Sequence, residues 1–392
     1  MKPARPLCFL LVVALVGLAP ASSAGARPQG DRSPPERSIR RAVVKTKKIA
    51  PGLVFKKIVQ KKIPRRTFVL VMDPSKAVTL DVALARTALP ALRPLSRVVQ
   101  THGALAGING DFSSGGAPVH PFAQDGELLR TSRQPGTLFA ITADESRTHF
   151  QVPDVSITVT QRGGGRVFPI ARWNDGPPAP GEIAGYSPLG GTLEPPPDAA
   201  CSARLLPDGP PTLADPTGVE RDYTVDAVGC QLSAMPRNGG VVLAGAPATD
   251  EAIQLLTLTP GTGMRLRWTL GLAGVLDAVG GTPVLVRDRR PLGSCSSACG
   301  ANPRTGIGVT ARGRILMVVV DGRRPRWSLG PTMNEFGRIM RDLGAVHALN
   351  LDGGGSSTMV VRDKVVNRPS DGRERGISSA VLVLPGPDPG EA

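Results

Sequence analysis

Short apolar runs bounded by turn residues dominate the first part of the chain, a pattern typical of β-strands. Runs at 67–72 and 78–84 are separated by the polar turn 73–76. A third run at 104–108 leads into the polar turn 109–112, which has the sequence NGDF. The stretch 89–102 is predicted to form a helix after Pro90.

Proline and glycine clusters make 170–215 the least regular stretch of the sequence. We predict that it forms loops inserted between strands. It is not expected to be a linker, because Trp173, Tyr186 and Leu189 need an apolar environment to pack in.

The hydrophobic period changes to that of a helix near the C-terminus. Thr332 and Glu335 have the spacing of a capping box, and Gly344 is placed to end the helix. Strand-like runs at 314–320 and 345–351 flank this helix. Its single apolar stripe is formed by Phe336, Ile339, Met340 and Leu343.

A strand–helix–strand unit of this kind usually joins two parallel strands by a right-handed crossover. If the two strands are neighbours, Asp321 and Asp352 lie together at one edge of the sheet, where open α/β sheets bind their ligands. We therefore predict an α+β fold, in which a mixed β-sheet forms the core and the strand–helix–strand unit carries the site.

Composition limits the class of protein. The chain has 392 residues, of which 41% are hydrophobic, and this is enough for one large domain or two modest ones. The hydrophobic fraction argues against general disorder, and the 47 glycines and 39 prolines argue against a helical bundle.

The first 26 residues have the pattern of a secretory signal peptide. Lys2 and Arg5 precede the apolar run 7–18, and the small residues at 24–26 offer a cleavage site. The alternative is an uncleaved membrane anchor, but the run is shorter than the roughly 20 residues that a spanning helix needs. We expect a secreted or cell-envelope protein.

Positive charge is concentrated after the signal peptide. Residues 27–66 contain 14 Lys or Arg and two carboxylates, so nearly all of the chain's net charge of +15 lies before residue 67. The nearly neutral remainder argues against a nucleic-acid partner. We divide the chain into a basic linker at 27–48, a domain at 49–385 and a flexible tail at 386–392. The linker is either a solvated arm or a contact for anionic envelope polymer.

Four cysteines remain after signal cleavage, and four cysteines allow three pairings. We expect Cys201 to pair with Cys230, and Cys295 with Cys299. A zinc site is the alternative, but the spacing is poor and the chain has only four His.

The segment 350–358, NLDGGGSST, is the strongest candidate for a site. Three consecutive glycines suit a backbone that approaches a ligand closely. With the hydroxyls that follow them, they suit an anion such as phosphate. The alternative is an ordinary glycine-rich turn. The candidate residues in this segment are Asn350, Asp352, Gly353, Gly354, Gly355, Ser356, Ser357 and Thr358.

Other polar residues are weaker candidates. Arg304 and Arg323 could bind phosphate as bidentate forks or form surface ion pairs. Asp111 could act in a site or only shape its turn, and the capping box accounts for Glu335. The four histidines are scattered and are interpreted as structural. Motifs of phosphate-loop NTPases, α/β-hydrolases and zinc proteases are absent from the sequence.

Six motifs occur along the chain: INGDF at 108–112, GGTP at 280–283, NPRTGIGV at 302–309, VDGR at 320–323, NLDGGGSST at 350–358 and NRPSDGRER at 367–375. In this order they resemble the phosphodiester glycosidase family, over roughly residues 50–385. Bacterial members of this family are often described as exopolysaccharide biosynthesis proteins. One departure is Gly110-Asp111, where many relatives have two glycines.

The resemblance implies hydrolysis between a sugar's anomeric carbon and a phosphodiester, which releases the free sugar and leaves a phosphomonoester. The expected substrate is a sugar-1-phosphodiester or a phosphate-containing glycopolymer. The catalytic candidates are Asp352 as base or nucleophile, Asp321 as its partner, Asp111 and Asn350. The substrate-binding candidates are Asn109, Arg304, Thr305, Arg323, the glycines and hydroxyls at 353–358, with Arg304, the 353–355 amides and Ser356 directed at the phosphate.

Two alternatives remain open at this point. A phosphodiesterase that uses Ca²⁺ or Mg²⁺ could cleave the P–O bond instead, since oxygen ligands suit these cations, although the sequence does not require a metal. The other alternative is a non-catalytic glycopolymer-binding protein. Such proteins usually stack sugars on exposed aromatic side chains, and aromatic residues make up only 4% of this chain.

Overall fold

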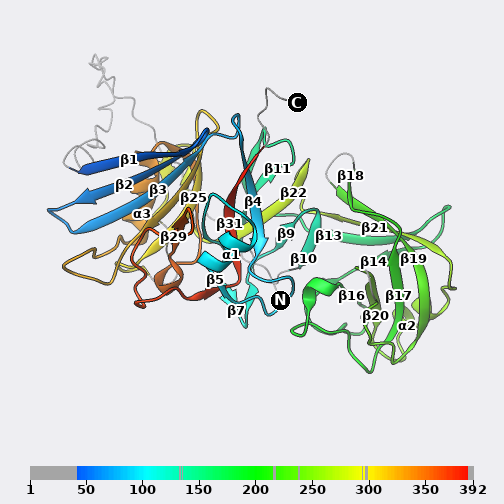
Figure 1. The fold of residues 1–392 in the computed structure, drawn as a ribbon. Helices are drawn as coiled ribbons and strands as arrows, with labels where there is room; N and C mark the ends of the chain where they lie inside the picture. Colours follow the sequence, from blue (N-terminus) through cyan, green and yellow to red (C-terminus); the bar gives the residue numbers. More distant parts are fainter. Residues whose placement is uncertain are drawn as a thin grey trace, which may run out of the picture. The chain divides into compact units, whose positions relative to one another are not determined.

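The computed structural model describes residues 42–386, except 132, 133, 135, 215–217, 237, 238, 294 and 296–298. The predicted signal peptide and nearly all of the predicted tail lie outside the described residues. Strands dominate the fold, and the described residues form only three α-helices (Figure 1). The fold is therefore richer in β-structure than the predicted α+β class.

An eight-stranded sheet forms one layer of the core, and each strand in it is antiparallel to its neighbours. In spatial order its strands are β1 (Val43–Ala50), β2 (Leu53–Gln60), β3 (Arg65–Met72), β26 (Ile315–Val320), β25 (Arg304–Thr310), β27 (Ala345–Asn350), β23 (Val284–Arg287) and β24 (Arg290–Pro291).

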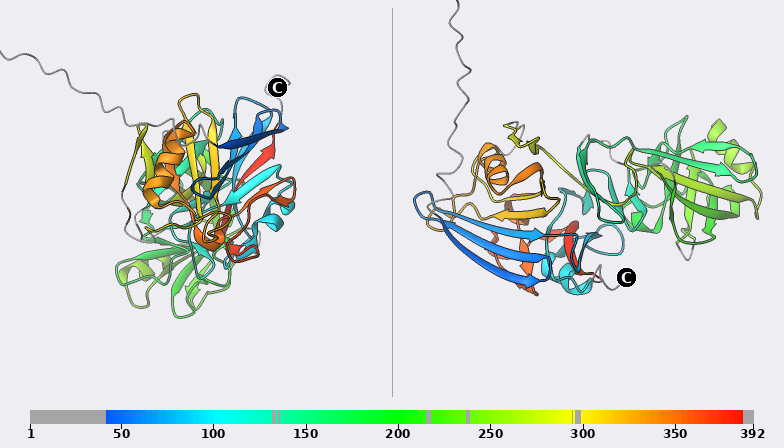
Figure 2. Two further views of the ribbon diagram at one scale, coloured as in Figure 1. Left: turned by 90° about the vertical axis from the view of Figure 1, so that its left-hand side faces the viewer. Right: turned by 90° about the horizontal axis from the view of Figure 1, so that it is seen from above.

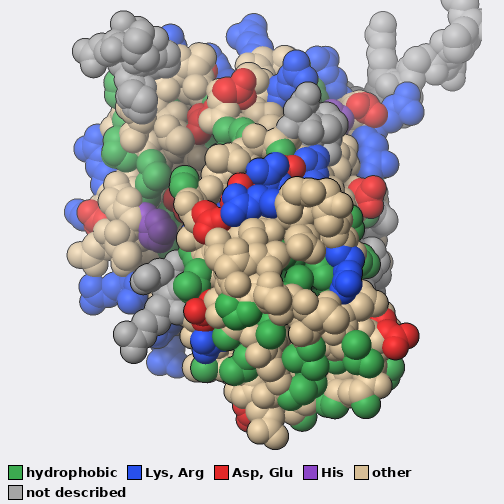
Figure 3. All heavy atoms as spheres, turned by 90° about the vertical axis from the view of Figure 1, so that its right-hand side faces the viewer, with side chains coloured by type: hydrophobic (Ala, Val, Ile, Leu, Met, Phe, Trp, Pro, Cys, Tyr) green, Lys and Arg blue, Asp and Glu red, His purple; other side chains and the backbone are tan. Residues whose placement is uncertain are grey.

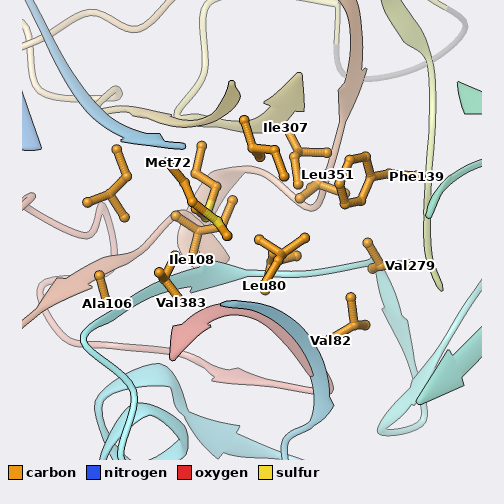
Figure 4. Close-up of a cluster of buried hydrophobic side chains, with 14 of the residues drawn as sticks. Met72, Leu80, Val82, Ala106, Ile108, Phe139, Val279, Ile307, Leu351 and Val383 are labelled. Atoms are coloured by element: carbon orange, nitrogen blue, oxygen red, sulfur yellow. The ribbon is translucent and has the colours of Figure 1, made fainter. Parts of the chain in front are cut away.

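A five-stranded antiparallel sheet packs against it. Met72 and Ile307 of the first sheet point toward Ile108 and Val383 of the second, in a buried cluster between the layers (Figure 4). Fully burying one such side chain contributes about 1.5–3 kcal/mol. The strands of the second sheet are β29 (Lys364–Val365), β28 (Met359–Val361), β6 (Ala106–Asn109), β31 (Ser379–Pro385) and β4 (Val78–Leu84).

A third antiparallel sheet is inserted in sequence between β6 and β23, and two short ladders pair elsewhere. The sheet contains β10 (Glu127–Arg130), β9 (Phe122–Gln124), β22 (Val275–Gly281), β11 (Thr137–Thr142) and β12 (Thr148–Gln151). The short ladders join β5 (Arg93–Pro94) to β30 (Gly376–Ile377), and β7 (Ser113–Ser114) to β8 (Ala117–Pro118).

A nine-stranded sheet completes the insertion and shares a hydrophobic core with the third sheet; this core includes Trp173, Tyr223 and Trp268. The predicted loops at 170–215 are therefore partly wrong, because four strands lie there. The sheet contains β14 (Val167–Pro169), β13 (Ser156–Gln161), β21 (Gly263–Thr269), β19 (Gly218–Cys230), β17 (Cys201–Pro207), β20 (Val241–Gly245), β16 (Ile183–Tyr186), β15 (Arg172–Trp173) and, beside β19, β18 (Thr212–Ala214).

The three helices lie on different sheets. The capping box of α3 (Met333–Asp342) is confirmed, and this helix covers the outer face of the eight-stranded sheet (Figure 2). α1 (Leu95–Thr101) is shorter than the predicted 89–102, because β5 takes the preceding residues. α2 (Asp250–Leu256) lies on the nine-stranded sheet, where hydrophobic side chains gather in the lower part of the face shown in Figure 3.

The strand–helix–strand prediction is correct in its elements and wrong in its pairing. β26 and β27 run parallel to one another, but β25 lies between them and is antiparallel to both. Their carboxyl ends nevertheless reach the same edge, together with the start of β25. This edge of the sheet, where Arg304 lies opposite Val320, carries the site described below.

One predicted boundary and two predicted disulfides can also be compared with the structure. Of the linker predicted at 27–48, residues 27–41 lie outside the described residues, and residues 43–48 belong to β1. The expected disulfides, Cys201–Cys230 and Cys295–Cys299, are both present. Among the described residues, none of the helices has the length and apolar character needed to traverse a bilayer.

Candidate active site

A cavity of about 510 Å³ opens at this edge of the eight-stranded sheet. Residues from β25, β27, the turn after β6 and several loops converge on it. Of the residues predicted from sequence, it contains Arg304, Arg323, Asn350, Asp352 and the three glycines that follow. The other lining residues are Phe112, Val119, His120, Gln134, Thr282, Pro283, Asn302, Met333 and Arg375.

The three glycines are needed for close packing. Gly354 has a φ of 62°, which is in the left-handed region that favours glycine. A Cβ atom on Gly353 would lie 2.9 Å from the Pro303 carbonyl oxygen, and one on Gly355 would overlap Arg375. Their amides are partly occupied, because Gly354 donates to Pro303 and Gly353 donates to the Asp352 carboxylate. Two of the three amides that are predicted to bind phosphate thus have acceptors within the protein.

Asp352 is fixed at the end of β27 by its own backbone. Its N–H donates to the Gly110 carbonyl at 3.1 Å, and its carbonyl accepts from Asn109 Nδ2 at 2.7 Å. Burial raises the pKa of its carboxyl, and the neighbouring Asp111 adds to the rise. The Ser356 hydroxyl, the Gly353 N–H and Arg375 act in the opposite direction. The carboxylate is thus held in a desolvated position beside cations.

Asn109 and Thr305 lie behind the cavity and join the two sheets of the core. Asn109 Oδ1 accepts hydrogen bonds from Thr305 Oγ1 at 2.9 Å and from the Thr358 N–H at 3.1 Å. Their side chains therefore support the segment that contains Asp352. The hydroxyls of Ser357 and Thr358 are buried, and neither has a hydrogen-bond partner among the described residues.

Asp111 and His120 form a buried pair. Asp111 Oδ1 lies 2.7 Å from His120 Nδ1, and its second oxygen accepts from the His120 N–H at 2.8 Å. This contact leaves Nε2 as the ring nitrogen available to the cavity, which His120 lines. Gly136 and Gly280 pack so closely on the ring that a Cβ at either position would overlap it. The ring is consequently held in one orientation.

Three arginines surround the glycine segment. Burial, together with the neighbouring Arg323, lowers the pKa of Arg304, whose Nη2 donates to the Gly300 carbonyl at 2.7 Å. Arg323 donates from Nε to Asn302 Oδ1 at 3.0 Å. Arg375 pairs with Asp371 at 2.7 Å. This cluster of guanidinium groups is suited to an anionic ligand.

Asp321 is not among the residues that line the cavity. It is buried, and its carboxylate accepts hydrogen bonds from Trp327 Nε1 at 2.7 Å, Asn367 Nδ2 at 3.1 Å and the Arg368 N–H at 3.0 Å. Burial raises its pKa against these hydrogen bonds. The structure thus does not bring Asp321 to Asp352 as a catalytic partner.

Nine residues that line the cavity were not predicted from the sequence, and His120, Asn302 and Arg375 are among them. Asn302 and Arg375 lie within the motifs at 302–309 and 367–375, so the motifs themselves carried the signal. His120 was interpreted as structural. Only its position nine residues after Asp111, across the β7–β8 hairpin, links it to the site.

Together, a desolvated carboxylate, an Asp–His pair and three guanidinium groups form the kind of site that hydrolases use on phosphate-bearing substrates. Residues 217–384 match the sequence model of the phosphodiester glycosidase family. The resemblance carried by the sequence motifs is thereby confirmed. The matched region contains Arg304, Arg323, Asp352 and Arg375, whereas Asp111 and His120 precede it.

The individual relatives are distant. An 82-residue segment is 37% identical to the SPbeta prophage-derived uncharacterized protein YomE of Bacillus subtilis (strain 168) and spans only 13% of that protein. A hypothetical protein from Synechocystis has a TM-score of 0.64 and 20% identity, over 87% of this chain and 63% of its own. A candidate exported protein of Burkholderia pseudomallei K96243 has a TM-score of 0.61 and 21% identity, over 88% and 96%. These two structures show the same fold.

Proposed function

We propose that this protein is an exported glycosidase that hydrolyses the bond between a sugar's anomeric carbon and a phosphodiester, in the processing of extracellular or envelope glycopolymer. The observation that carries the proposal is the convergence of Asp352, the Asp111–His120 pair and three arginines on one cavity. The family match supports the reaction type, and the two disulfides are consistent with export.

The arginines are assigned to the phosphodiester. Arg323 and Arg375 lie within contact distance of where side chains on Gly354 and Gly355 would stand, so both reach over the glycine segment. Arg304 approaches the same cavity from the start of β25. When the bond to the sugar breaks, the phosphate oxygen gains charge, and fixed cations stabilise that charge without reorganising.

Asp352 and His120 are assigned to the sugar. The Asp352 carboxylate stabilises the oxocarbenium-like transition state at the anomeric carbon. His120 accepts a proton at Nε2 from water, whose oxygen bonds to that carbon while the phosphate leaves with the electron pair of the broken C–O bond. Asp111 holds Nδ1 and stabilises the imidazolium that results.

Asn350 and Asp321 take different roles. Asn350 donates from Nδ2 to the Thr282 carbonyl at 2.7 Å, and its Oδ1 has no hydrogen-bond partner among the described residues. We propose that this oxygen accepts a hydrogen bond from a hydroxyl group of the sugar. Asp321, which does not line the cavity, is assigned to positioning the loops that begin at Gly322 and Asn367.

The bond that is cleaved can be identified in water enriched in ¹⁸O. Hydrolysis at the anomeric carbon places ¹⁸O in the released sugar, which is the expected result. Label in the phosphomonoester would mean P–O cleavage, the reaction of the alternative phosphodiesterase that uses Ca²⁺ or Mg²⁺. A parallel reaction in EDTA tests the need for a metal. Binding of the sugar-1-phosphodiester without turnover would identify a glycopolymer-binding protein instead.

A further inference from the structure

Six cations continue outward from the cavity along the same edge of the eight-stranded sheet. They come from β2, the turn between β2 and β3, the start of β3 and the two loops 321–330 and 367–375. We name this group the cationic strip; its members are Lys57, Lys61, Lys62, Arg66, Arg326 and Arg368.

Trp327 lies at the centre of the strip. The guanidinium of Arg66 lies 3.5 Å from the centroid of the indole ring, that of Arg368 lies 4.8 Å away, and Lys57 Nζ lies 5.8 Å away. Asp321 fixes the ring by accepting its Nε1–H. One indole thus gathers three cations that would otherwise spread into solvent.

The loops that contain the strip also supply the cavity with arginines. Loop 321–330 contains Arg323, and loop 367–375 contains Arg375. Arg324 Nη2 joins the loops by donating to the carbonyls of Pro369 and Ser370 at 3.2 and 3.5 Å. The same two hydrogen-bonded loops therefore contribute to both the cavity and the strip.

This surface has few compensating carboxylates. The two loops contain six arginines and three acidic residues. Of the acids, Asp321 is buried, Asp371 pairs with Arg375, and Glu374 accepts hydrogen bonds from Ser96. Within the described part of the chain, no member of the strip lies within 4.0 Å of a carboxylate as an ion pair. Arg66 lies close enough to the buried Asp321 carboxylate to act against the rise of its pKa, so the strip is compensated only in part. Its remaining cations attract an extended polyanion.

We propose that the cationic strip binds the phosphates of a linear glycopolymer whose phosphodiesters repeat along the chain, while one phosphodiester of the same chain occupies the cavity. The inference rests on the proposed function and names its substrate class. A single phosphodiester carries one negative charge, which the cavity arginines already match. The cations outside the cavity have a role only if further phosphates follow. Nucleic acid is a poorer fit, because cations cover the face of Trp327 on which a base would stack.

The test compares two probes that share one reacting bond: a linear polymer of N-acetylhexosamine 1-phosphate repeats, and the one-repeat methyl phosphodiester of the same sugar. The double variant Lys57→Gln/Arg368→Gln removes two cations of the strip. The matched control, Lys76→Gln/Arg312→Gln, removes two exposed cations from turns at the opposite edge of the sheet.

We expect kcat/KM on the polymer to fall roughly thirtyfold at low salt in the strip variant, since each of the two cations removed contributes about 1 kcal/mol toward an anionic surface. Its kcat/KM on the one-repeat diester should stay within about twofold of the wild-type value. The control should match the wild type on both probes, and salt should weaken the polymer preference of the wild type. Equal melting temperatures serve as the folding control.

Several results would overturn the inference. These are equal loss on both probes, no loss on the polymer, and the same loss in the control variant. Competition by phosphatidylglycerol vesicles or single-stranded DNA, as strong as by the polymer at equal phosphate, would show an unselective polyanion surface. If the wild type cleaves neither probe, the proposed function fails. Titration calorimetry with the polymer then still tests the strip, because the strip variant must bind it more weakly.

Discussion

The chemistry of single residues here is set by what surrounds them. Asp352 and Asp321 both follow buried strands, and burial raises the pKa of each. Asp352 faces a cavity lined by arginines, whereas the carboxylate of Asp321 is occupied by three donors. One is therefore available for a reaction, and the other is available only to hold its neighbours in place.

Asp352→Asn should lower kcat/KM on a sugar-1-phosphodiester by at least about 10²-fold, because it removes the charge and keeps the size. Since the reaction needs the ionised form and the pKa of Asp352 is raised, the acid limb of the wild-type pH profile should lie above pH 3.8. Activity is lost as pH falls through that raised value. Normal turnover by a folded variant would end the assignment.

His120→Gln should lower kcat by about 10²-fold, the low end for a positioned base. Asp111→Asn should cost less, because the imidazole stays in the cavity but loses the acceptor that fixes Nδ1. His347→Gln is the matched control, since His347 lies outside the cavity-lining residues. Steady-state kinetics on the same substrate measures all three variants. If His120→Gln leaves kcat unchanged, the role of activating water must be assigned to Asp352 instead of His120.

Sequence alone could predict the residues of the site that are adjacent in the chain. Asn350, Asp352 and the glycines lie in one segment, so their motif needed no fold to be noticed. His120 becomes part of the site only when the turn after β6 meets β27 and the glycine segment. Arg375 depends in the same way on the loop that folds over Gly355. Contacts between distant segments leave no local pattern.

At the scale of elements, the same contrast separates α3 from α1. The stripe and capping box of α3 are local signals, and the helix forms where the sequence predicts it. α1 begins late because the residues before it pair with β30, almost 300 positions away. Likewise, nothing between β26 and β27 in sequence shows that β25 inserts between them in space.

The N-terminus of α3 is also pinned to β3. Glu335 closes the capping box and pairs with Arg65 at 2.9 Å, and the Arg65 side chain is only 10% exposed. Glu335→Gln keeps the capping box but leaves a nearly buried cation without its partner. We expect a loss of about 1 kcal/mol, discounted for the exposure of Glu335, and a melting temperature lower by about 2 °C.

The double variant Arg65→Gln/Glu335→Gln separates the two contributions of Glu335. It should be about as stable as the single variant or more stable, because the uncompensated cation is gone. Thermal melts of the wild type, Arg65→Gln, Glu335→Gln and the double variant complete this double-mutant cycle. If Glu335→Gln melts with the wild type, the ion pair contributes nothing and the capping box alone matters.

At the scale of the whole molecule, the core sandwich and the inserted strands meet at a cluster of acidic residues. Asp81 of β4, Asp125 of the β9–β10 turn and Asp277 of β22 place carboxylate oxygens within 4.8 Å of one another. Burial raises the pKa of Asp277 to about 7, and the charges of Asp125, Asp81 and Glu145 add to the rise. His102 lies 3.7 Å from Asp81 and opposes its charge.

This cluster predicts a pH dependence of stability. The unfolded chain releases the Asp277 proton near pH 3.8 and the native protein near pH 7, so the native state binds more protons between these values. Stability should therefore fall as pH rises through that window. Asp277→Asn should melt with the wild type at pH 4 and at least about 2 °C higher at pH 8. EDTA keeps divalent cations off the cluster, exposed Asp198→Asn is the control, and a variant less stable at pH 8 would contradict the prediction.

The order of strands in the second sheet has a consequence for the timing of folding. β31 is the last strand that the structure describes, yet it is an interior strand of that sheet, between β6 and β4. Asn109, at the end of β6, pairs with Ala380 of β31 and donates to Asp352. The first half of the chain therefore cannot close the cavity by itself as it is synthesised. Folding of this site therefore waits for β31, whose contacts with β4 and β6 join residues far apart in the sequence and are slow to form.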